Sequence, residues 1–265
     1  MAAIRVEHTG EQSEITRLTI SHPDHRNALT WEMYEQLYAA CEEADARGAR
    51  VVVLRGDPAA GGAFAAGTDI RHFAAFADGK ADGEEGLACE RRMSRVLNRV
   101  LALRAPLVGV VEGPAVGGGL ALAAACDLLL ATPAARFGVP IARTLGNCLP
   151  ASVIARLKDR LGGARAMALL LTGELLSAEA ARDAGFVYRL VSPGGLEDEL
   201  AALTERLRGC APLTLAALKE TDRRLTAAAA ATDTDDLLRA CYGSADFREG
   251  VRAFLDHRAP RWQGR

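Results

Sequence analysis

The sequence predicts a layered α/β fold, and three observations support this prediction. Two short apolar runs, residues 51–54 and 107–111, have the composition of strands that are covered on both faces. Each run leads through a loop rich in glycine and alanine toward a helical pattern. The last third of the chain, from residue 177 onward, is mainly helical in pattern. Such strand–loop–helix passages are typical of a sheet layered with helices.

Length and composition indicate one domain with a substantial core. The chain has 265 residues, of which 49% are hydrophobic. We expect residues 1–195 to form the α/β core and residues 196–265 to form a helical region of the same domain, because no long linker separates them. The 32 Lys and Arg residues nearly balance the 34 Asp and Glu residues, which gives no electrostatic case for a nucleic-acid partner.

The six cysteines show neither a disulfide framework nor a zinc pattern, since no C-x-x-C pair and no histidine cluster accompany them. Reduced thiols in a cytoplasmic protein are the expected state. The charged N-terminal segment lacks an apolar signal, and the apolar runs are shorter than the roughly 20 residues needed to span a bilayer. We therefore predict a cytoplasmic protein with no membrane partner and no metal site.

The first half of the chain predicts these elements in order. Residues 4–7 and 15–20 are expected to be strands, separated by a turn that contains Gly10. Thr30 is the expected N-cap of a helix over residues 31–46. Residues 73–86 are polar and weakly patterned, which fits either a mobile lid or a solvated loop, and residues 90–103 have helical spacing.

The second half predicts a further strand and a series of helices. An alanine-rich helix is expected over residues 120–126, followed by a strand over residues 128–131. The later expected helices lie at residues 177–184, 196–208, 213–226, 234–242 and 247–258.

Two segments carry the clearest chemistry: AFAAGTDIRHF at 63–73 and GPAVGGGLALAAACD at 113–127. Small residues after a strand let a ligand approach the backbone and leave amide N–H groups unobstructed. At a helix N-terminus, unpaired amides and the macrodipole also favour negative charge. Two such amides that converge on one carbonyl oxygen form an oxyanion hole. Close helix–strand packing is the alternative explanation for the glycine triplet when it is considered alone.

The joint pattern resembles the enoyl-CoA hydratase/isomerase (crotonase) family. The motifs HPDHRNALT, AFAAGTDI, PLVGVVEGPAVGGGLALAAACDLLLA, ARFGVP, LTGELLSAEAARDAGFVYRLV and DFREGVRAF occur in the family's order and spacing, over residues 4–254. The resemblance implies a crotonase-like spiral of repeated ββα units with a C-terminal helical trimerisation region. It also implies an acyl-CoA thioester as substrate, a homotrimer or a dimer of trimers, and no cofactor apart from the coenzyme A of the substrate.

The resemblance also assigns site residues. The backbone amides of Thr68 and Gly118 correspond to the two oxyanion donors. The positions that correspond to substrate and coenzyme A contacts are Arg26, Ala28, Ala66, Asp69, Ile70, Arg71, Gly117, Ile141 and Arg143. A guanidinium suits the coenzyme A phosphates, although each arginine is equally well explained as a solvated surface residue. Asp69 has a second explanation as the cap of a helix that begins near Ile70.

The sequence departs from the family pattern at two positions. A family hydratase carries one glutamate two residues after the glycine triplet and a second directly after the later Gly-x-Pro, and the pair positions a water and exchanges its proton. The corresponding residues here are Ala121 and Ile141. Neither side chain transfers a proton, so ordinary hydration is doubtful.

Other groups near the second position are candidates for chemistry. Asn147 is a candidate hydrogen-bonding residue, and Cys148 is a candidate nucleophile whose alternative role is that of a small buried hydrophobic residue. Arg143 is a candidate for holding an anionic acyl group. His72, four residues after Thr68, is either a proton carrier that faces the pocket or a surface residue.

Two hypotheses for function follow from these residues. The first is an enzyme that stabilises a thioester enolate and goes on to decarboxylation, because breaking a carbon–carbon bond next to the thioester needs oxyanion stabilisation first and a proton source second. Double-bond isomerisation is the alternative reaction, and it requires a base that the motifs do not identify. The second is an acyl-CoA-binding protein with little or no turnover. Both hypotheses share the same coenzyme A pocket.

Overall fold

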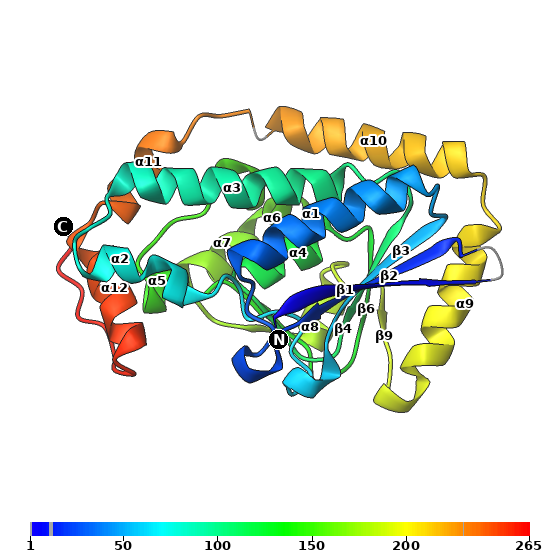
Figure 1. Cartoon of the computed structure of the whole chain (residues 1–265), viewed down its shortest axis with the longest axis horizontal. Coiled ribbons are helices and arrows are strands. Elements are labelled where there is room, and N and C mark those ends of the chain that lie inside the picture. The colour runs from blue at the N-terminus through cyan, green and yellow to red at the C-terminus, as the bar shows by residue number, and fades with distance from the viewer. Residues whose placement is uncertain (1, 11–12, 230) are drawn as a thin grey trace.

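The computed structural model describes residues 2–10, 13–229 and 231–265, and a six-stranded sheet forms its centre (Figure 1). The strand order in this sheet is β1-β2-β3-β4-β6-β9. β1 and β2 are antiparallel, whereas the other neighbouring strands are parallel. The strands span Ala3–Thr9 (β1), Ile15–Ser21 (β2), Val51–Gly56 (β3), Leu107–Val111 (β4), Leu128–Ala131 (β6) and Arg189–Leu190 (β9).

A smaller sheet beside the first contains β5 (Pro114–Val116), β7 (Arg136–Gly138) and β8 (Leu176–Ser177), in the order β5-β7-β8. The chain passes from β4 in the large sheet to β5 in the small one and then into helix α4 (Gly118–Ala125). This passage is one ββα unit of the predicted kind. It confirms the mixed α/β fold, and it places the glycine triplet where β5 turns into α4.

Both faces of the large sheet are covered, as the continuous apolar runs predict. In β3, Val52 and Leu54 face the main core, whereas Val51 and Val53 pack with Leu200 of α9 (Leu196–Arg208) in a separate cluster. The alternation follows from the two-residue period of a strand. Figure 1 shows α9 on one side of the sheet and α1 (Trp31–Ala46) with α3 (Gly83–Leu101) on the other.

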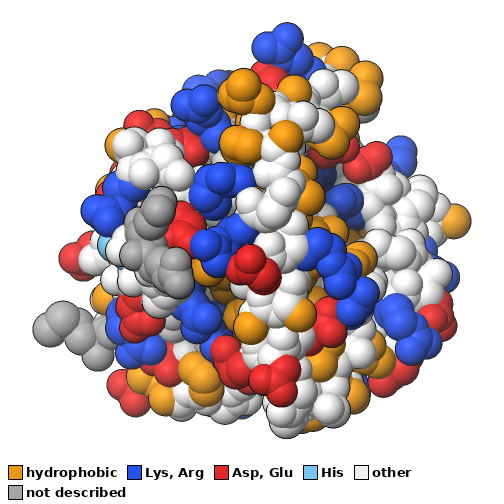
Figure 2. Space-filling model, turned by 90° about the vertical axis from the view of Figure 1, so that its right-hand side faces the viewer, with side chains coloured by type: hydrophobic (Ala, Val, Ile, Leu, Met, Phe, Trp, Pro, Cys, Tyr) orange, Lys and Arg blue, Asp and Glu red, His pale blue; other side chains and the backbone are white. Residues whose placement is uncertain are grey.

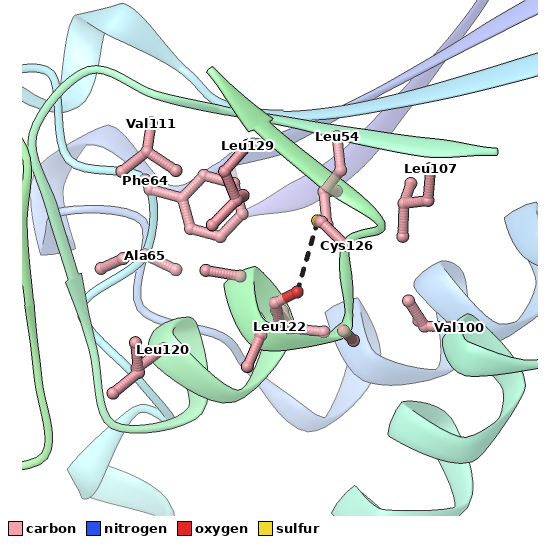
Figure 3. Close-up of a cluster of buried hydrophobic side chains, with 14 of the residues drawn as sticks. Leu54, Phe64, Ala65, Val100, Leu107, Val111, Leu120, Leu122, Cys126 and Leu129 are labelled. Carbon is pink, nitrogen blue, oxygen red and sulfur yellow. Dashed lines mark hydrogen bonds between the residues drawn. The ribbon is translucent and has the colours of Figure 1, made fainter. Parts of the chain in front are cut away.

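The main core is tightly packed around the C-terminal end of α4 (Figure 3). Cys126 is fully buried, and its thiol donates a hydrogen bond to the Leu122 carbonyl at 3.4 Å. A Cβ placed on Gly109 of β4 would lie 2.5 Å from Leu129 Cδ2 and 2.8 Å from Cys126 Sγ, so these side chains would have to shift to accommodate it. This packing holds α4 against the sheet and therefore places its first turn.

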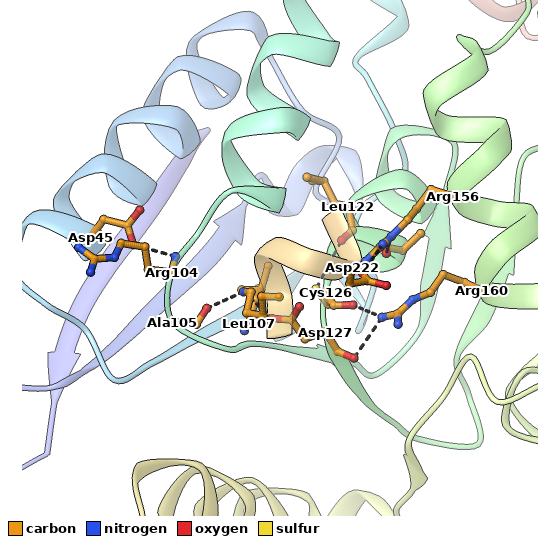
Figure 4. A network of polar contacts seen from close by, with 12 residues as sticks. Asp45, Arg104, Ala105, Leu107, Leu122, Cys126, Asp127, Arg156, Arg160 and Asp222 are labelled. Atoms are coloured by element: carbon orange, nitrogen blue, oxygen red, sulfur yellow. Dashed lines mark hydrogen bonds and ion pairs between the residues drawn. The ribbon is translucent and has the colours of Figure 1, made fainter. Parts of the chain in front are cut away.

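The C-terminal end of α4 is held by side chains from α6 (Ala151–Leu161), as Figure 4 shows. Arg156 is buried and donates from Nε to the Ala124 carbonyl at 3.0 Å. Arg160 donates to the carbonyls of Cys126 and Asp127. Cations at a helix C-terminus satisfy its free carbonyls and complement its dipole. Asp127 has a structural role, since its carboxylate accepts a hydrogen bond from the Leu107 amide at 2.7 Å.

One end of the molecule is built from short helices around an aromatic cluster. α2 (Ala74–Ala77), α5 (Ile141–Thr144), α11 (Asp235–Tyr242) and α12 (Ala245–Leu255) gather there in Figure 1. Phe76, Tyr242 and Phe247 are buried, with ring centroids 5.0 Å apart for Phe76–Phe247 and 4.6 Å apart for Tyr242–Phe247. The C-terminal helices thus pack onto the segment that follows residue 69.

Several boundaries differ from the sequence prediction. α3 begins at Gly83 rather than at residue 90, because Asp82 forms a capping box with Glu85. The segment at 73–86 was predicted to be a loop, but it contains the end of a 3-10 helix over Ile70–Phe73, all of α2 and the start of α3. The remaining helices span Gly163–Thr172 (α7), Ala178–Asp183 (α8) and Pro212–Ala229 (α10), and further 3-10 helices span Pro23–His25, Pro58–Ala60 and Pro193–Gly195.

The surface is mixed in charge on the face that Figure 2 shows, where Lys and Arg side chains are interspersed with Asp and Glu. Surfaces that bind nucleic acid concentrate positive charge on one face instead. Within the described ranges, no helix is long and apolar enough to cross a membrane.

Candidate functional site

A cavity of about 850 Å³ lies between α3, the first turn of α4 and the short helices of the C-terminal end. Its size falls within the range of pockets that bury a small-molecule ligand. The predicted chemical motifs meet in this cavity, because its wall includes residues from the 24–28, 66–71 and 116–118 segments. The C-terminal helices contribute Tyr242, Phe254 and Leu255 to the same wall.

The structure brings Thr68 and Gly118 together in this cavity, as the sequence predicts. A Cβ placed on Gly118 would lie 3.7 Å from the Thr68 amide nitrogen, and one placed on Gly67 would lie 3.5 Å from the Gly118 nitrogen. Gly118 is the first residue of α4, where an amide N–H has no partner within the helix. The two donors therefore lie side by side at the positive end of the α4 dipole.

The direction of the Thr68 amide follows from its neighbours. Residues 67–69 pair with Leu29, which donates to the Gly67 carbonyl at 2.8 Å and accepts from the Asp69 amide at 2.9 Å. Successive N–H groups of an extended segment point to opposite sides. The Thr68 N–H therefore points away from Leu29 and toward the first turn of α4.

Close backbone contacts explain the small residues in both motifs. A Cβ on Gly119 would lie 2.2 Å from the Ala65 carbonyl oxygen, so α4 reaches its position only with glycine there. Gly117 has a φ of 56°, in the left-handed region that favours glycine. The packing role and the proposed chemical role of the triplet are therefore compatible, since close approach of the backbones is what brings the two amides together.

A partly buried chain of hydrogen bonds supports the Thr68 side of the site. Tyr34 Oη lies 2.9 Å from Thr68 Oγ1, and Thr68 Oγ1 donates to Met93 Sδ at 3.1 Å. Because the threonine hydroxyl has a single hydrogen, Tyr34 is the donor in the first bond. Burial raises the pKa of Tyr34 above its ordinary value, so the phenol stays protonated.

The residues at the two glutamate positions line the cavity but offer no proton. Ala121, one turn into α4, and Ile141, at the start of α5, are both half-buried in the wall. Leu97, Leu122 and Leu149 lie in the same wall. The inner part of the cavity is therefore largely apolar.

The predicted coenzyme A contacts lie in the same cavity wall, with one exception. Its lining includes Arg26, Ala28, Ala66, Asp69, Ile70, Arg71, Gly117 and Ile141. Asp69 is also the predicted cap, because its carboxylate accepts from the Arg71 amide at 3.0 Å. The Arg71 side chain is exposed and also pairs with this carboxylate, whose pKa falls below its usual range despite the opposing effect of burial.

Arg143 is the exception, since it is exposed and does not belong to the cavity lining in the described chain. His72 also lies elsewhere, stacked on Trp31 with ring centroids 5.2 Å apart and accepting a hydrogen bond from the Trp31 amide. Burial lowers the pKa of His72 below its ordinary value. Neither side chain is placed to meet a group at Thr68 and Gly118.

Asn147 and Cys148 lie beside the cavity on the segment after α5. Asn147 lines it and donates from Nδ2 to Tyr242 Oη at 3.1 Å, while its Oδ1 is buried with no hydrogen-bond partner among the described residues. The hydrogen-bonding interaction with Cys241, which stabilises the protonated thiol of Cys148, and burial together raise the pKa of Cys148. A thiolate nucleophile at Cys148 is therefore disfavoured, and its catalytic role stays a prediction.

The sequence prediction missed one acidic group in the wall. Glu90 of α3 lines the cavity and is only 5% exposed, and its carboxylate accepts a hydrogen bond from Tyr242 Oη. Burial raises the pKa of Glu90 to about 7, against the lowering effect of the Tyr242 hydrogen bond. Glu90 therefore changes protonation near neutral pH.

A signal for Glu90 was present in the sequence. It lies in the charged run CERR, which resembles a solvated helix face. However, it follows Leu87 by three residues and precedes Leu97 by seven, so it falls on the apolar stripe of the helix. A carboxylate on such a stripe is a candidate for a buried, functional group.

Comparisons with known proteins agree with this geometry. The family model described as "Enoyl-CoA hydratase/isomerase" matches residues 10–265. A putative enoyl-CoA hydratase of Thermus thermophilus is 34% identical over 260 residues, covering 95% of this chain and 98% of the relative. A 1,2-epoxyphenylacetyl-CoA isomerase of Escherichia coli is 30% identical, covering 95% of each chain.

A solved structure extends the likeness to the fold. The crystal structure of an enoyl-CoA hydratase/carnithine racemase from Magnetospirillum magneticum matches with a TM-score of 0.78 and 32% identity. The match covers 100% of this chain and 97% of the other. The order of motifs, the arrangement of ββα units and these relatives lead to one conclusion: the chain belongs to the enoyl-CoA hydratase/isomerase family and has the crotonase fold.

Proposed function

We propose that this protein binds an acyl-CoA thioester and stabilises its enolate with the amides of Thr68 and Gly118, in a decarboxylation or double-bond isomerisation rather than a hydration. The observation that supports this proposal best is the juxtaposition of the two amides, with the Thr68 nitrogen 3.7 Å from a Cβ built on Gly118. Hydrogen-bond donors fixed where negative charge develops stabilise an enolate oxygen without reorganising.

The wall residues support a reaction other than hydration. Hydration needs a positioned water and a group that exchanges its proton, and general acid–base help of this kind is worth about 10²–10⁴-fold in rate. Ala121 and Ile141 supply neither. The isomerase name of the 30% identical relative shows that a family member is described as acting on a CoA thioester by isomerisation.

The mouth of the cavity suits coenzyme A. Arg26 and Arg71 in the lining are exposed, so their guanidinium groups are accessible to phosphate oxygens. Arg71 would do so while keeping its pairing with Asp69. The thioester then lies deeper, at Thr68 and Gly118, and the acyl chain contacts the apolar wall.

The test is a comparison of three substrates. Crotonyl-CoA, methylmalonyl-CoA and 3-butenoyl-CoA are incubated separately with the protein, and the products are separated by liquid chromatography and identified by mass spectrometry. We expect conversion of the second or the third substrate and little hydration of the first. Hydration of crotonyl-CoA with a kcat well above about 10 s⁻¹, the median for enzymes, would contradict the proposal.

Binding without turnover is the second candidate, favoured by the apolar residues at positions 121 and 141. Infrared difference spectroscopy on a thioester labelled with carbon-13 at its carbonyl measures polarisation directly. A shift of the carbonyl band to lower frequency on binding, with no product from any of the three substrates, would identify an acyl-CoA-binding protein. Binding with neither a band shift nor a product would contradict the oxyanion role itself.

A further inference from the structure

One face of α3 runs along the cavity toward the oxyanion donors. Glu90, Met93, Ser94 and Leu97 all line the cavity, and their spacing of three, four and seven residues places them on one side of the helix. Glu90 is the acidic member of this face. It is also buried, so the face does not present it to bulk solvent.

This face connects Glu90 to the predicted reaction point. Met93 Sδ accepts the hydrogen bond from Thr68 Oγ1 at 3.1 Å, and Thr68 supplies one oxyanion amide. Glu90 precedes Met93 by three residues, which places the two on adjacent turns of the helix, with a rise of about 4.5 Å between them. The charge of Glu90 is also felt at Tyr34, which donates to the same Thr68 hydroxyl.

A directed hydrogen-bond chain fixes the carboxyl group from the other side. Asn147 Nδ2 donates to Tyr242 Oη, and Tyr242 Oη donates to Glu90 Oε1. Tyr242 itself is fully buried and pressed onto α3, since a Cβ on Gly86 would lie 2.2 Å from Tyr242 Cβ. One carboxyl oxygen is therefore held while the group remains part of the cavity wall.

We infer that Glu90 is a catalytic acid–base residue that exchanges a proton with the acyl group whose thioester oxygen is held by Thr68 and Gly118. The inference rests on the proposed function and extends it, because it supplies the proton carrier that Ala121 and Ile141 cannot provide. Tyr242 and Asn147 act through Glu90 and are positioning residues.

The proton transfers balance for both candidate reactions. With a 3-enoyl-CoA, the Glu90 carboxylate takes a proton from C2, the electron pair moves into a dienolate, and the resulting acid returns the proton to C4 to leave the 2-enoyl product. With a malonyl-type CoA, the bond from C2 to the carboxylate breaks and carbon dioxide leaves. The Glu90 acid then protonates C2 and is reprotonated from solvent.

The two reactions require opposite starting forms of Glu90, so they differ in pH dependence. Because the pKa of Glu90 is raised to about 7 by burial, the carboxylate needed for isomerisation accumulates above this pH, and the acid needed for decarboxylation accumulates below it. The titratable groups that act on Glu90 or respond to its charge are Tyr242, Cys148, Cys89 and Tyr34. The two phenols and the thiols of Cys89 and Cys148 have pKa values raised above their ordinary values, whereas the interaction with Cys148 lowers the pKa of Cys241 to about 7. Glu90 and Cys241 therefore both titrate near neutrality, and of these two Glu90 is the one that lines the cavity.

The test compares Glu90→Gln with Glu84→Gln. Glu84 lies on the same helix but is exposed and pairs with Arg239 on the surface, so its variant controls for the same chemical change outside the cavity. We expect Glu90→Gln to lower kcat by about 10²–10⁴-fold with little change in KM, and Glu84→Gln to leave both unchanged. Thermal melting and calorimetric titration with acyl-CoA check that both variants fold and bind.

The pH profile is a second readout. We expect kcat/KM for 3-butenoyl-CoA to rise with pH through about 7 and kcat/KM for methylmalonyl-CoA to fall through the same range. Glu90→Gln should abolish this pH dependence for both substrates. Tyr242→Phe removes a hydrogen bond that stabilises the Glu90 carboxylate, so it should shift the pH-dependent change in kcat/KM to higher pH rather than abolish activity.

The outcomes separate this inference from the proposed function. A folded Glu90→Gln protein that retains kcat within tenfold of the wild type overturns the role of Glu90 and leaves the enolate proposal intact. A wild-type protein that gives no product from either substrate overturns both. A carbonyl band shift that persists in Glu90→Gln together with lost turnover supports both.

Discussion

Gly118 lines the cavity with its backbone alone, and a larger residue at this position is excluded on steric grounds. A Cβ at this position would lie 2.8 Å from Tyr34 Oη. Tyr34→Phe removes this oxygen and makes room for a Cβ. Gly118 can then be replaced by proline, which lacks the amide N–H, without the clash. Proline is tolerated at the first position of a helix, where its missing N–H leaves no helical bond unmade.

We therefore expect the double variant Gly118→Pro/Tyr34→Phe to lose about 10²–10³-fold in kcat relative to Gly118→Ala/Tyr34→Phe, because only the proline removes an oxyanion donor. Steady-state kinetics on whichever substrate the wild type converts measure this ratio. Equal activity of the two double variants would show that the Gly118 amide does not bind the enolate oxygen.

Glu90 also makes stability depend on pH. Its pKa is about 7 in the folded protein and 4.5 ordinarily, so the folded state binds this proton more tightly than the unfolded state. The stabilising contribution is fully present below pH 4.5 and is lost as the pH rises through 7. The loss amounts to about 3 kcal/mol, from 1.36 kcal/mol for each pKa unit.

Glu90→Gln has no proton that titrates at this position, so it does not lose this stabilisation as the pH rises. The free energy of unfolding of the variant minus that of the wild type should therefore increase by about 3 kcal/mol from acidic to alkaline pH. Urea unfolding at about pH 5 and about pH 8 measures the difference. Glu84→Gln should show no such trend. A constant difference between Glu90→Gln and wild type across this range would mean that Glu90 titrates at its ordinary pKa.

At the scale of elements, the position of α11 on α3 decides whether Tyr242 reaches Glu90. The two helices meet at glycines, since a Cβ on Gly86 would overlap Tyr242 and one on Gly83 would lie 2.4 Å from the Arg239 carbonyl. The atom nearest to a Cβ on Gly86 is Tyr242 Cβ, at the root of the tyrosine side chain, which moves only with its helix. The α3–α11 contact therefore depends on the absence of a side chain at this position.

We expect Gly86→Ala to destabilise the protein by about 1–3 kcal/mol, the usual cost of overpacking, and to lower activity by displacing Tyr242 from Glu90. Gly163→Ala is the matched control, because its Cβ would meet only Lys158 Cε at 3.7 Å, in ordinary contact. Chemical denaturation and kinetics of both variants test this. A Gly86→Ala protein as stable as the control would show that α11 shifts freely on α3.

At the scale of the whole molecule, α10 leaves large apolar side chains in solvent. Leu213, Leu218 and Leu225 are 76%, 64% and 69% exposed, and Leu218 and Leu225 are two turns apart on one side of the helix. Figure 1 shows α10 along the edge of the molecule, beyond α3. An exposed apolar stripe of this kind marks a surface for association.

We expect the chain to form the homotrimer or dimer of trimers that the family resemblance implies, and Leu218→Asp/Leu225→Asp to weaken that assembly. Sedimentation velocity compares the wild type with the variant against the 28.0 kDa mass of one chain. Arg224→Asp on the same helix, which exchanges an exposed charge, is the control. A wild type that sediments as a monomer at micromolar concentration would contradict the expectation.

Prediction from sequence succeeded where a local rule or a joint motif applied. Thr30 caps α1 because its hydroxyl accepts the Met33 amide at 3.2 Å, and β4 and β6 coincide with their apolar runs. α6 and α7 were not predicted, and α3 was placed seven residues late, because its first turns rest on the Asp82 capping box and on contact with α11 rather than on an apolar pattern of their own. Among the site residues, the motifs predicted the meeting of Thr68 and Gly118, whereas Arg143 was predicted to hold a ligand but lies outside the cavity wall.

By itself, the sequence determined the family, the layered fold and the apolar residues at 121 and 141, and its motifs predicted the pair of oxyanion amides, because each depends on residue types at fixed spacing along the chain. Only the tertiary structure pointed to Glu90 as the candidate proton carrier. Glu90 and Tyr242 are 152 residues apart in sequence, and their pairing depends on α11 packing against α3. Burial gives the carboxyl its raised pKa, and burial is a property of the packed molecule rather than of any local segment.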